Sequence, residues 1–386
     1  MKKTMLFFVL GLMIFGFKNI NAQGESAVAF LLLAPDSRAG GLGESGAGLA
    51  DNSAAIFWNP AGLAFLTGSE VSITHSNWLP QFNLDLFYDY LTYRQYIEEI
   101  DGNISASITY MNFGEFARTN SSGPEVVDVF TSFDAALTLG YATKISSDWG
   151  LGFNFRLIHS KLSDKPTESE TGSGVATSVS FDIAAMWRPE HLELPFIGDI
   201  GNKLSIGVNL SNLGPKIYYI DQEQADPIPT NFRLGFAAKI FEDEYNSLTY
   251  TLDFSKLLVD RSTDSTKDRK DFYEAVFTAW GDQSFNNELR DIVTSMGVEY
   301  WYGIPEEFMF ALRAGYFYED PAYGNRKFAT FGAGIRYDLY GFDFSYLTTT
   351  LVGGDENHPL AETLRFSLLI GWGTAPQKVT GFPRGI

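Results

Sequence analysis

The sequence of 386 residues contains no cysteine and only four histidines. Without cysteine there is no disulfide framework, no thiolate metal site and no thiol nucleophile. Basic residues are also few, because 28 Lys and Arg stand against 47 Asp and Glu and leave a formal net charge of -19. A nucleic-acid-binding surface needs clustered basic residues to neutralise phosphate, so this charge balance argues against such a role.

Long apolar runs are absent as well, except at the N-terminus. Lys2 and Lys3 precede an uncharged apolar stretch from Thr4 to Phe17, and a short polar stretch then leads to Ala22. This arrangement predicts a secretory signal peptide at 1–22. No later segment has the roughly 18 consecutive apolar residues of a transmembrane helix. The mature chain is therefore expected to be exported, either as a soluble protein or as a β-barrel.

What the sequence does have is a high aromatic content, 15%, and alternation with a period of two from about residue 69 onward. In one segment Val179, Phe181 and Ile183 alternate with Ser180 and Asp182. Such alternation is typical of strands. It predicts about fourteen strands, an even number as in bacterial barrels. Their expected ranges are 69–77, 84–95, 103–113, 128–142, 148–160, 174–188, 203–211, 229–241, 245–258, 289–302, 307–319, 326–338, 340–350 and 361–373.

A soluble β-sandwich would also alternate, but three features favour a membrane barrel. The segments are long enough to cross a bilayer at a tilt. Aromatic residues stand at segment ends on the apolar face, and charges stand mid-segment on the opposite face, where a wet or plugged lumen tolerates them. The fold class is therefore predicted as all-β, a single transmembrane antiparallel β-barrel over residues 67–373. The aromatic residues are Tyr141, Trp187, Tyr300, Tyr318, Tyr337, Tyr346 and Trp372, and the charged ones are Asp134, Arg156, Asp182, Arg233, Asp253, Arg313, Arg336, Asp343 and Arg365.

The connections between the expected strands alternate between short and long. Short turns belong to the periplasm and long loops to the cell exterior, so an even strand count predicts that both termini are periplasmic. Residues 374–386 are then a short periplasmic tail. The connection Pro189–Asn202 is longer than the other turns and has no explanation in the pattern. The long connections are 114–127, 161–173, 212–228, 259–288 and 352–360.

Residues 23–66 do not alternate and are rich in Gly and Ala. Because a fourteen-strand barrel encloses more space than its wall side chains can fill, this segment is expected to be a plug inside the lumen. We expect its polar and aromatic residues to hold it against lumen charges such as Arg156 and Asp182, since a buried charge needs a partner. The residues in question are Asp36, Arg38, Trp58 and Asn59.

Two motifs in this segment carry a resemblance. Residues 33–41 read Leu-Ala-Pro-Asp-Ser-Arg-Ala-Gly-Gly, and residues 56–61 read Ile-Phe-Trp-Asn-Pro-Ala. Together they resemble the N-terminal signature of the PorV/PorQ family, a Bacteroidota branch of the FadL-like barrels, and PorV-type members are the closer match. The matching residues include Pro35, Asp36, Arg38, Gly40, Gly41, Trp58, Asn59 and Pro60.

The resemblance implies a cell outer-membrane component of the type IX secretion system. A protein of this family is expected to associate with the SprA (Sov) translocon and to bind the C-terminal domains of secreted substrates. It would then pass the substrates to the attachment complex that contains the PorU sortase. The resemblance implies no enzymatic activity and no cofactor, and it leaves outer-membrane lipid as the remaining partner. A FadL-like transporter of hydrophobic small molecules, with a movable N-terminal hatch, is the alternative.

Two external connections carry apolar residues that could bind a partner. One is the run Ile217–Ile220, and the other is a set with helical spacing in 271–281. Local packing of each loop would also explain them, whereas exposed apolar patches rimmed by charge mark partner sites. The candidate partner-binding residues are Ile217, Tyr218, Tyr219, Ile220, Phe272, Tyr273, Phe277 and Trp280.

Other motifs are weaker. Residues 41–46 match the dinucleotide fingerprint, but that fingerprint is meaningful only between a strand and a helix of a βαβ unit. The four histidines are scattered, and Asp260, Asp264 and Asp268, which recur every four residues, lack the Ca²⁺-loop pattern. No catalytic set is apparent, so no metal, cofactor or enzymatic activity is predicted.

Overall fold

The computed structural model describes residues 26–82, 84–120, 123–164, 172–195, 198–260, 269–304, 307–352 and 359–373. The predicted signal peptide at 1–22 and the predicted tail at 374–386 lie outside these residues. In the part of the chain that is described, no helix is both long enough and apolar enough to cross a membrane.

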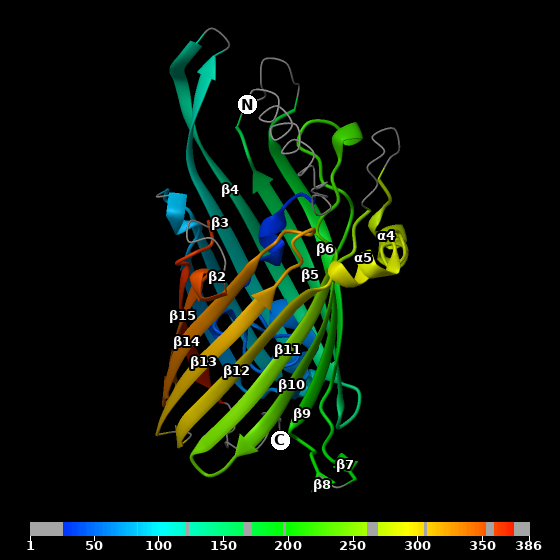
Figure 1. The fold of residues 1–386 in the computed structure, drawn as a ribbon, viewed down its shortest axis with the longest axis vertical. Helices are drawn as coiled ribbons and strands as arrows, with labels where there is room; N and C mark the ends of the chain where they lie inside the picture. Colours follow the sequence, from blue (N-terminus) through cyan, green and yellow to red (C-terminus); the bar gives the residue numbers. More distant parts are fainter. Residues whose placement is uncertain are drawn as a thin grey trace, which may run out of the picture.

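Fourteen antiparallel strands form a closed barrel, in which each strand pairs with its neighbour in the chain and β1 closes onto β16 (Figure 1). The prediction of a fourteen-strand antiparallel barrel is confirmed. The strands are β1 (Ser69–Asn77), β2 (Phe87–Ile97), β3 (Gly102–Asn120), β4 (Gly123–Lys144), β5 (Trp149–Lys161), β6 (Val175–Trp187), β9 (Leu204–Leu213), β10 (Asn231–Glu242), β11 (Asn246–Leu257), β12 (Val293–Ile304), β13 (Phe308–Tyr318), β14 (Lys327–Tyr337), β15 (Tyr340–Thr348) and β16 (Leu364–Trp372).

The alternation in the sequence becomes two faces of the wall. On β5, Asn154 and Arg156 are buried in the lumen, whereas their neighbour Phe155 is 42% exposed on the outside. On β6, Asp182 is buried and Ile183 is exposed in the same way. A lipid-facing apolar side and a polar interior are what a membrane barrel requires.

Two connections differ from the expected loops. The strands β3 and β4 continue pairing up to Asn120 and Gly123, whereas β2 pairs with β3 only as far as Asn112. They form a two-stranded ribbon that projects beyond the rest of the barrel, where the alternation predicted a loop at 114–127 (Figure 1). The long connection Pro189–Asn202 contains a small hairpin of its own, β7 (Glu193–Leu194) and β8 (Gly198–Asp199).

We call the end of the barrel with the long connections the loop end and the opposite end the turn end. Short helices are found in the connections and in the segment before β1. Within that segment lie η1 (Ala29–Leu32), α2 (Ser37–Gly40), α3 (Ala55–Trp58) and η2 (Pro60–Phe65). Within the connections lie η3 (Pro80–Phe82), η4 (Glu98–Ile100), η5 (Gln222–Gln224), α4 (Phe272–Thr278), α5 (Phe285–Arg290) and η6 (Thr350–Val352).

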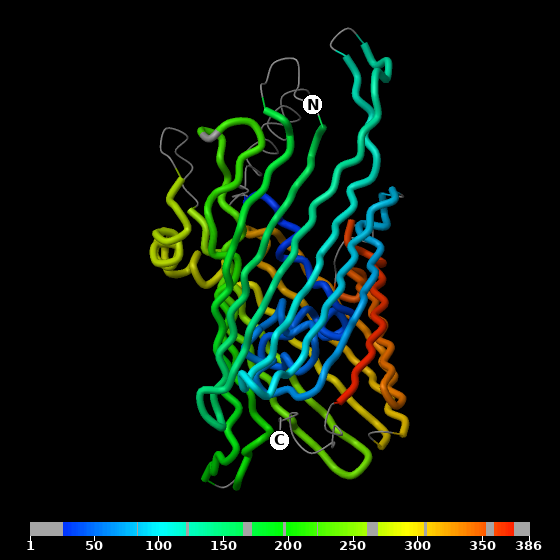
Figure 2. The backbone as a smooth tube through the Cα atoms, turned by 180° about the vertical axis from the view of Figure 1, so that it is seen from behind, coloured from blue at the N-terminus to red at the C-terminus, as the bar shows by residue number. Residues whose placement is uncertain are grey.

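Residues 26–66, which we call the lumenal segment, lie inside the barrel (Figure 2). At the loop end, the Ala27 amide donates to the carbonyl of Pro227 at 3.0 Å. At the turn end, the segment runs into β1, and Arg94 donates to the carbonyl of Thr67 at 3.0 Å. The first described residues therefore lie at the opposite end from the one predicted for both termini. Strand parity fixes the ends of β1 and β16 only, and the lumenal segment runs back through the barrel.

Candidate functional site: the lumenal segment and the external loops

Asp36 joins the two motifs of the lumenal segment. One oxygen of its carboxylate accepts the Ala39 amide at 3.0 Å and so caps the first turn of α2. The other oxygen accepts the indole N–H of Trp58 at 2.6 Å. Both side chains are buried. Asp36 therefore holds together two parts of the segment that are 22 residues apart.

Arg38 ties the segment to the wall. Its guanidinium donates to both oxygens of Glu299 on β12, at 2.8 and 2.6 Å, and it also pairs with Asp51 of the segment. Glu299 in turn accepts from Arg313 at 2.7 Å. Arg313 also donates a hydrogen bond to Asp343 at 2.8 Å. These groups form one chain of alternating charge, partly buried at Arg38 and Asp51 and fully buried at the other three residues, and every member has a partner of opposite sign.

Arg156 and Asp182, which the sequence predicts as partners of the lumenal segment, do not pair with Arg38. Arg156 pairs with Asp182 at 2.8 Å, and both then bond to Asn212 where β9 ends. Alternation predicts correctly that these charges face the lumen, but it does not give the height at which each one lies. The link from this cluster to the lumenal segment is the side-chain amide of Asn154, which donates both to Asp182 and to the carbonyl of Ile56.

Polar wall residues hold the backbone of the segment elsewhere. The Asp253 carboxylate on β11 accepts the amides of Gly46 and Ala47, both at 2.8 Å. On β3, the amide of Asn103 donates to the carbonyls of Leu63 and Leu66 at 2.7 and 2.8 Å. The wall residues Asn103 and Asn154 are not among the site residues that the sequence predicts. Their signal is an amide side chain at an inward position of a strand.

Asn59 and Pro60 start η2. The Asn59 side chain accepts the Ala61 amide at 3.0 Å, and its own amide reaches the carbonyl of Ala185 on β6 at 3.2 Å. Proline is favoured at the first position of a helix because its missing N–H would have no partner there. The second motif therefore begins a helical turn and also anchors it to the wall.

Glycines let the segment and the wall approach closely. A Cβ on Gly315 of β13 would lie 2.0 Å from the backbone nitrogen of Gly43, and a Cβ on Gly235 of β10 would lie 2.3 Å from that of Gly48. Gly41, in the first motif, would meet the Cα of Gly332 at 3.1 Å. Backbone presses on backbone at these positions, so no side chain can move aside. Residues 41–46 are part of this contact, and the βαβ context of a dinucleotide fingerprint is absent from the described residues around them.

The two candidate partner loops differ in exposure. In the connection between β9 and β10, Ile217 is only 2% exposed, and the Tyr219 hydroxyl bonds to Ser160 at 2.8 Å. Ile220 is half-buried, and Tyr218 alone points outward, at 51% exposure. Ile217 thus packs into the molecule and does not contribute to an exposed patch.

The connection between β11 and β12 forms α4 and α5, which stand beside the wall at the loop end (Figure 1). The helical spacing in 271–281 predicts α4 correctly. On α4, Phe277 is 80% and Tyr273 56% exposed, Trp280 just after it is 46% exposed, and Phe272 is half-buried. The helix α5 was not predicted, and it adds Phe285 at 75% exposure.

Buried and exposed ion pairs hold these helices in place. Lys256 of β11, itself 3% exposed, pairs with Glu288 of α5 at 2.8 Å and with Asp291 just after it. Arg290 donates to Asp320 at 2.8 Å, and this hydrogen bond lowers the pKa of the Asp320 carboxyl below its ordinary value. The exposed aromatic face is therefore presented on a fixed support.

The described residues contain no group of three or more His, Asp or Glu that could hold a metal ion. Three of the four histidines lie in pairs with Asp89, Thr177 and Asp199, and the fourth, His358, lies outside the described residues.

Comparison with known proteins gives a family. The family model described as type IX secretion system protein PorV matches residues 18–264, which is more than half of the chain. No curated protein matches the chain. Among solved structures, the barrel is similar to a Pseudomonas aeruginosa FadL homologue, at 14% identity and a TM-score of 0.48 over 87% of this chain and 97% of that one. It is also similar to the Pseudomonas putida toluene transporter TodX, at 11% identity and a TM-score of 0.48 over 90% and 97% of the two chains. The chain belongs to the PorV family of type IX secretion system proteins, and its fold is a fourteen-strand barrel of the outer membrane.

Proposed function

We propose that the protein is a non-enzymatic component of type IX secretion that captures other proteins with its external loops. In this role it associates with the SprA (Sov) translocon and binds the C-terminal domains of secreted substrates. It then passes these substrates to the PorU attachment complex. Family membership supports the secretion role. The observation that carries the proposal is the exposed aromatic face of α4 and α5 on a rigid support.

The α4–α5 face has the properties of an interface. Phe277 and Phe285 are exposed to 80% and 75%, beyond what solubility in water favours. Aromatic anchors commonly contribute about 2 kcal/mol or more each when a partner removes them from water. Because Lys256 and Arg290 hold the helices, little conformational freedom is lost on binding, which favours affinity.

The lumenal segment is proposed to be a fixed plug. A movable hatch would have to break the ion pairs of the partly buried Arg38, one of them to the buried Glu299, and the hydrogen bonds that the buried Asp253 accepts. Breaking a buried ion pair costs about 3–5 kcal/mol, since it leaves an uncompensated charge. This cost disfavours the alternative function, a FadL-like transporter of hydrophobic small molecules whose hatch opens.

The test is a double variant, Phe277→Ser with Phe285→Ser, expressed in the native host. We expect wild-type amounts of folded barrel, together with loss of SprA recovery and of substrate secretion. The matched control is Tyr340→Ser with Tyr337→Ser, which removes two aromatics of 59% and 63% exposure near the turn end. Wild-type secretion and SprA recovery in the α4–α5 variant would contradict the proposal. A defect of equal size in the control would show that exposed aromatics act only through assembly in the membrane.

A further inference from the structure

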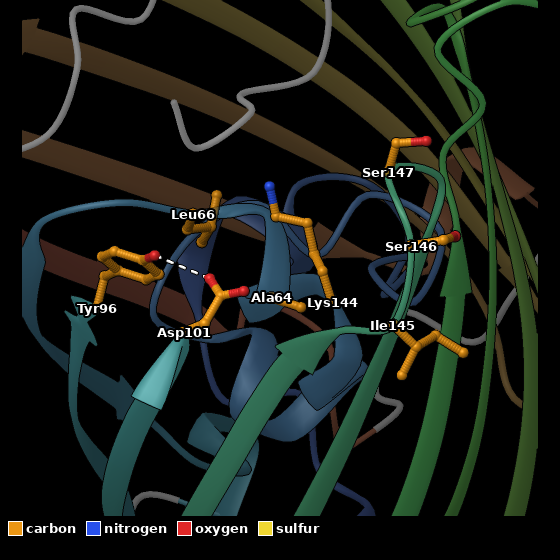
Figure 3. Close-up of a pocket in the computed structure, with 8 residues that line it drawn as sticks. All are labelled: Ala64, Leu66, Tyr96, Asp101, Lys144, Ile145, Ser146 and Ser147. Atoms are coloured by element: carbon orange, nitrogen blue, oxygen red, sulfur yellow. Dashed lines mark hydrogen bonds between the residues drawn. The ribbon is translucent and has the colours of Figure 1, made fainter. Parts of the chain in front are cut away.

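A pocket of about 480 Å³ opens at the turn end of the barrel (Figure 3). Ala64 and Leu66, at the base of the lumenal segment, form one side of it. The other sides come from the turn between β2 and β3 and the turn between β4 and β5. This volume lies within the range of ligand-binding pockets, and nothing in the proposed capture of substrates by external loops requires it.

Opposite charges face the pocket from its two sides. Lys144 ends β4, and its side chain extends over the pocket (Figure 3). Across the described chain, no carboxylate lies within ion-pair distance of its ammonium group. On the other side, one carboxylate oxygen of Asp101 accepts the hydroxyl of Tyr96 at 2.9 Å, which fixes the orientation of the carboxylate.

Apolar and hydroxyl groups lie between the two charges. Leu66 and Ala64 are buried, while Ile145 is 62% exposed at the rim. The Ser146 hydroxyl accepts the amide of Trp149 at 3.2 Å, so it still has a proton to donate. The lining thus offers a cation, an anion, a hydroxyl donor and an apolar surface within one cavity.

This lining excludes simpler occupants. Asp101 repels a lone anion, Lys144 repels a lone cation, and a purely apolar molecule would remove both charges from water without pairing them. A zwitterionic phospholipid headgroup would satisfy the charges, but Lys144 has the inward parity of the buried residues Thr138 and Ala142 on β4. The pocket therefore opens toward the mouth of the barrel and away from the bilayer.

We propose that the pocket binds a short extended segment of a periplasmic protein. The turn end of an outer-membrane barrel faces the periplasm, which is where such a segment is available. The bound segment carries an acidic side chain for Lys144, an apolar side chain for Ile145 at the rim and a basic side chain for Asp101. The site is independent of the external loops, so it can fail while the proposed secretion role stands.

The first test is binding of capped tripeptides to the full chain in detergent, followed by saturation-transfer NMR. Acetyl-Glu-Leu-Arg-amide is the probe, and its Glu-Leu-Glu and Arg-Leu-Arg counterparts are the controls. We expect saturable binding of the first peptide and at least tenfold weaker binding of the other two. Lys144→Glu should reverse this preference toward Arg-Leu-Arg, a change that loss of folding cannot produce. Absence of saturable binding, or binding that Lys144→Glu leaves unchanged, would overturn the proposal.

The second test places a photo-cross-linking amino acid at Ser147 in the native host, after the heat-modifiable gel mobility of the variant has been checked. A cross-link to a periplasmic protein, mapped to a segment with the acidic–apolar–basic pattern, supports the proposal. A cross-link to a segment without that pattern, to residues 374–386 of the chain itself or to phospholipid overturns it. No cross-link at all also overturns it.

Discussion

Glu299→Gln should loosen the lumenal segment, because it removes the negative charge of a side chain that accepts hydrogen bonds from both Arg38 and Arg313. Glu299 is 1% exposed, so the two guanidinium groups lose a buried partner and face each other more directly. Breaking a buried pair costs about 3–5 kcal/mol. We use the lower limit, about 3 kcal/mol, because Arg38 keeps Asp51 and Arg313 keeps Asp343. Local opening of the segment should then become roughly a hundredfold more frequent.

The absence of cysteine makes this opening measurable. Ala39→Cys introduces a single thiol at a site that is 5% exposed, and its maleimide labelling rate in detergent reports how often the segment opens. The control for Glu299→Gln is Asp320→Asn, which breaks an arginine pair whose Arg290 is 48% exposed. An exposed pair contributes only about 0–1 kcal/mol, so labelling should rise less than about fivefold. If the introduced thiol is labelled at the same rate with and without Glu299→Gln, the charge chain does not hold the segment and the fixed-plug argument is wrong.

Three further predictions concern other parts of the barrel. Gly315→Val should displace the lumenal segment and raise ion conductance in planar bilayers, because its Cβ would lie 2.0 Å from the backbone of Gly43. The control Gly371→Val should leave the conductance unchanged, because its Cβ would meet nothing closer than 3.7 Å. Leu137→Arg, on the lipid side of β4 at 42% exposure, should lower the unfolding free energy by about 2–4 kcal/mol in urea titrations in lipid, and an unchanged midpoint would contradict its placement in the bilayer. The hydrogen bond from Arg290 lowers the pKa of Asp320 from 3.8, so this ion pair stabilises the α5 connection above pH 3.8 and the stabilisation is lost as the pH falls below 3.8. In the wild type, cleavage of α5 by a protease should therefore increase below pH 3.8, and Asp320→Asn should show the increased cleavage already at neutral pH.

The wall could be predicted from the sequence because the polarity of each strand residue indicates whether its side chain faces lipid or the lumen. The strand predicted at 69–77 is β1 with the same bounds, and the charges of Asp182 and Arg313 face the lumen as expected. A period of two needs no knowledge of distant residues, since lipid on one side and polar groups on the other impose it locally.

Contacts across the lumen could not be predicted in this way. Arg38 pairs with Glu299, 261 residues away, and alternation gives the face of Glu299 but not its height along the barrel axis. The Ile217–Ile220 run illustrates the same limit, because its composition is that of an exposed patch while Ile217 is buried beneath the loop. Pairing between β3 and β4 continues beyond the residues that pair with β2 and β5, where the barrel wall no longer imposes alternation, so the sequence predicts a loop there.

The path of the lumenal segment through the closed barrel bears on where a partner can bind. Leu66 leads directly into β1, and β1 pairs with β2 on one side and with β16 on the other. With β16 paired to β1, the closed wall encloses a segment that runs from Ala27, whose amide donates to Pro227 at the loop end, to Leu66, which lies next to Thr67 at the turn end. Because the wall supplies glycines and polar partners at the positions where the segment lies against it, segment and wall form one packed unit. We propose that the segment leaves no path for a substrate through the lumen, so that binding takes place at the two ends of the barrel, on surfaces such as the α4–α5 face at the loop end.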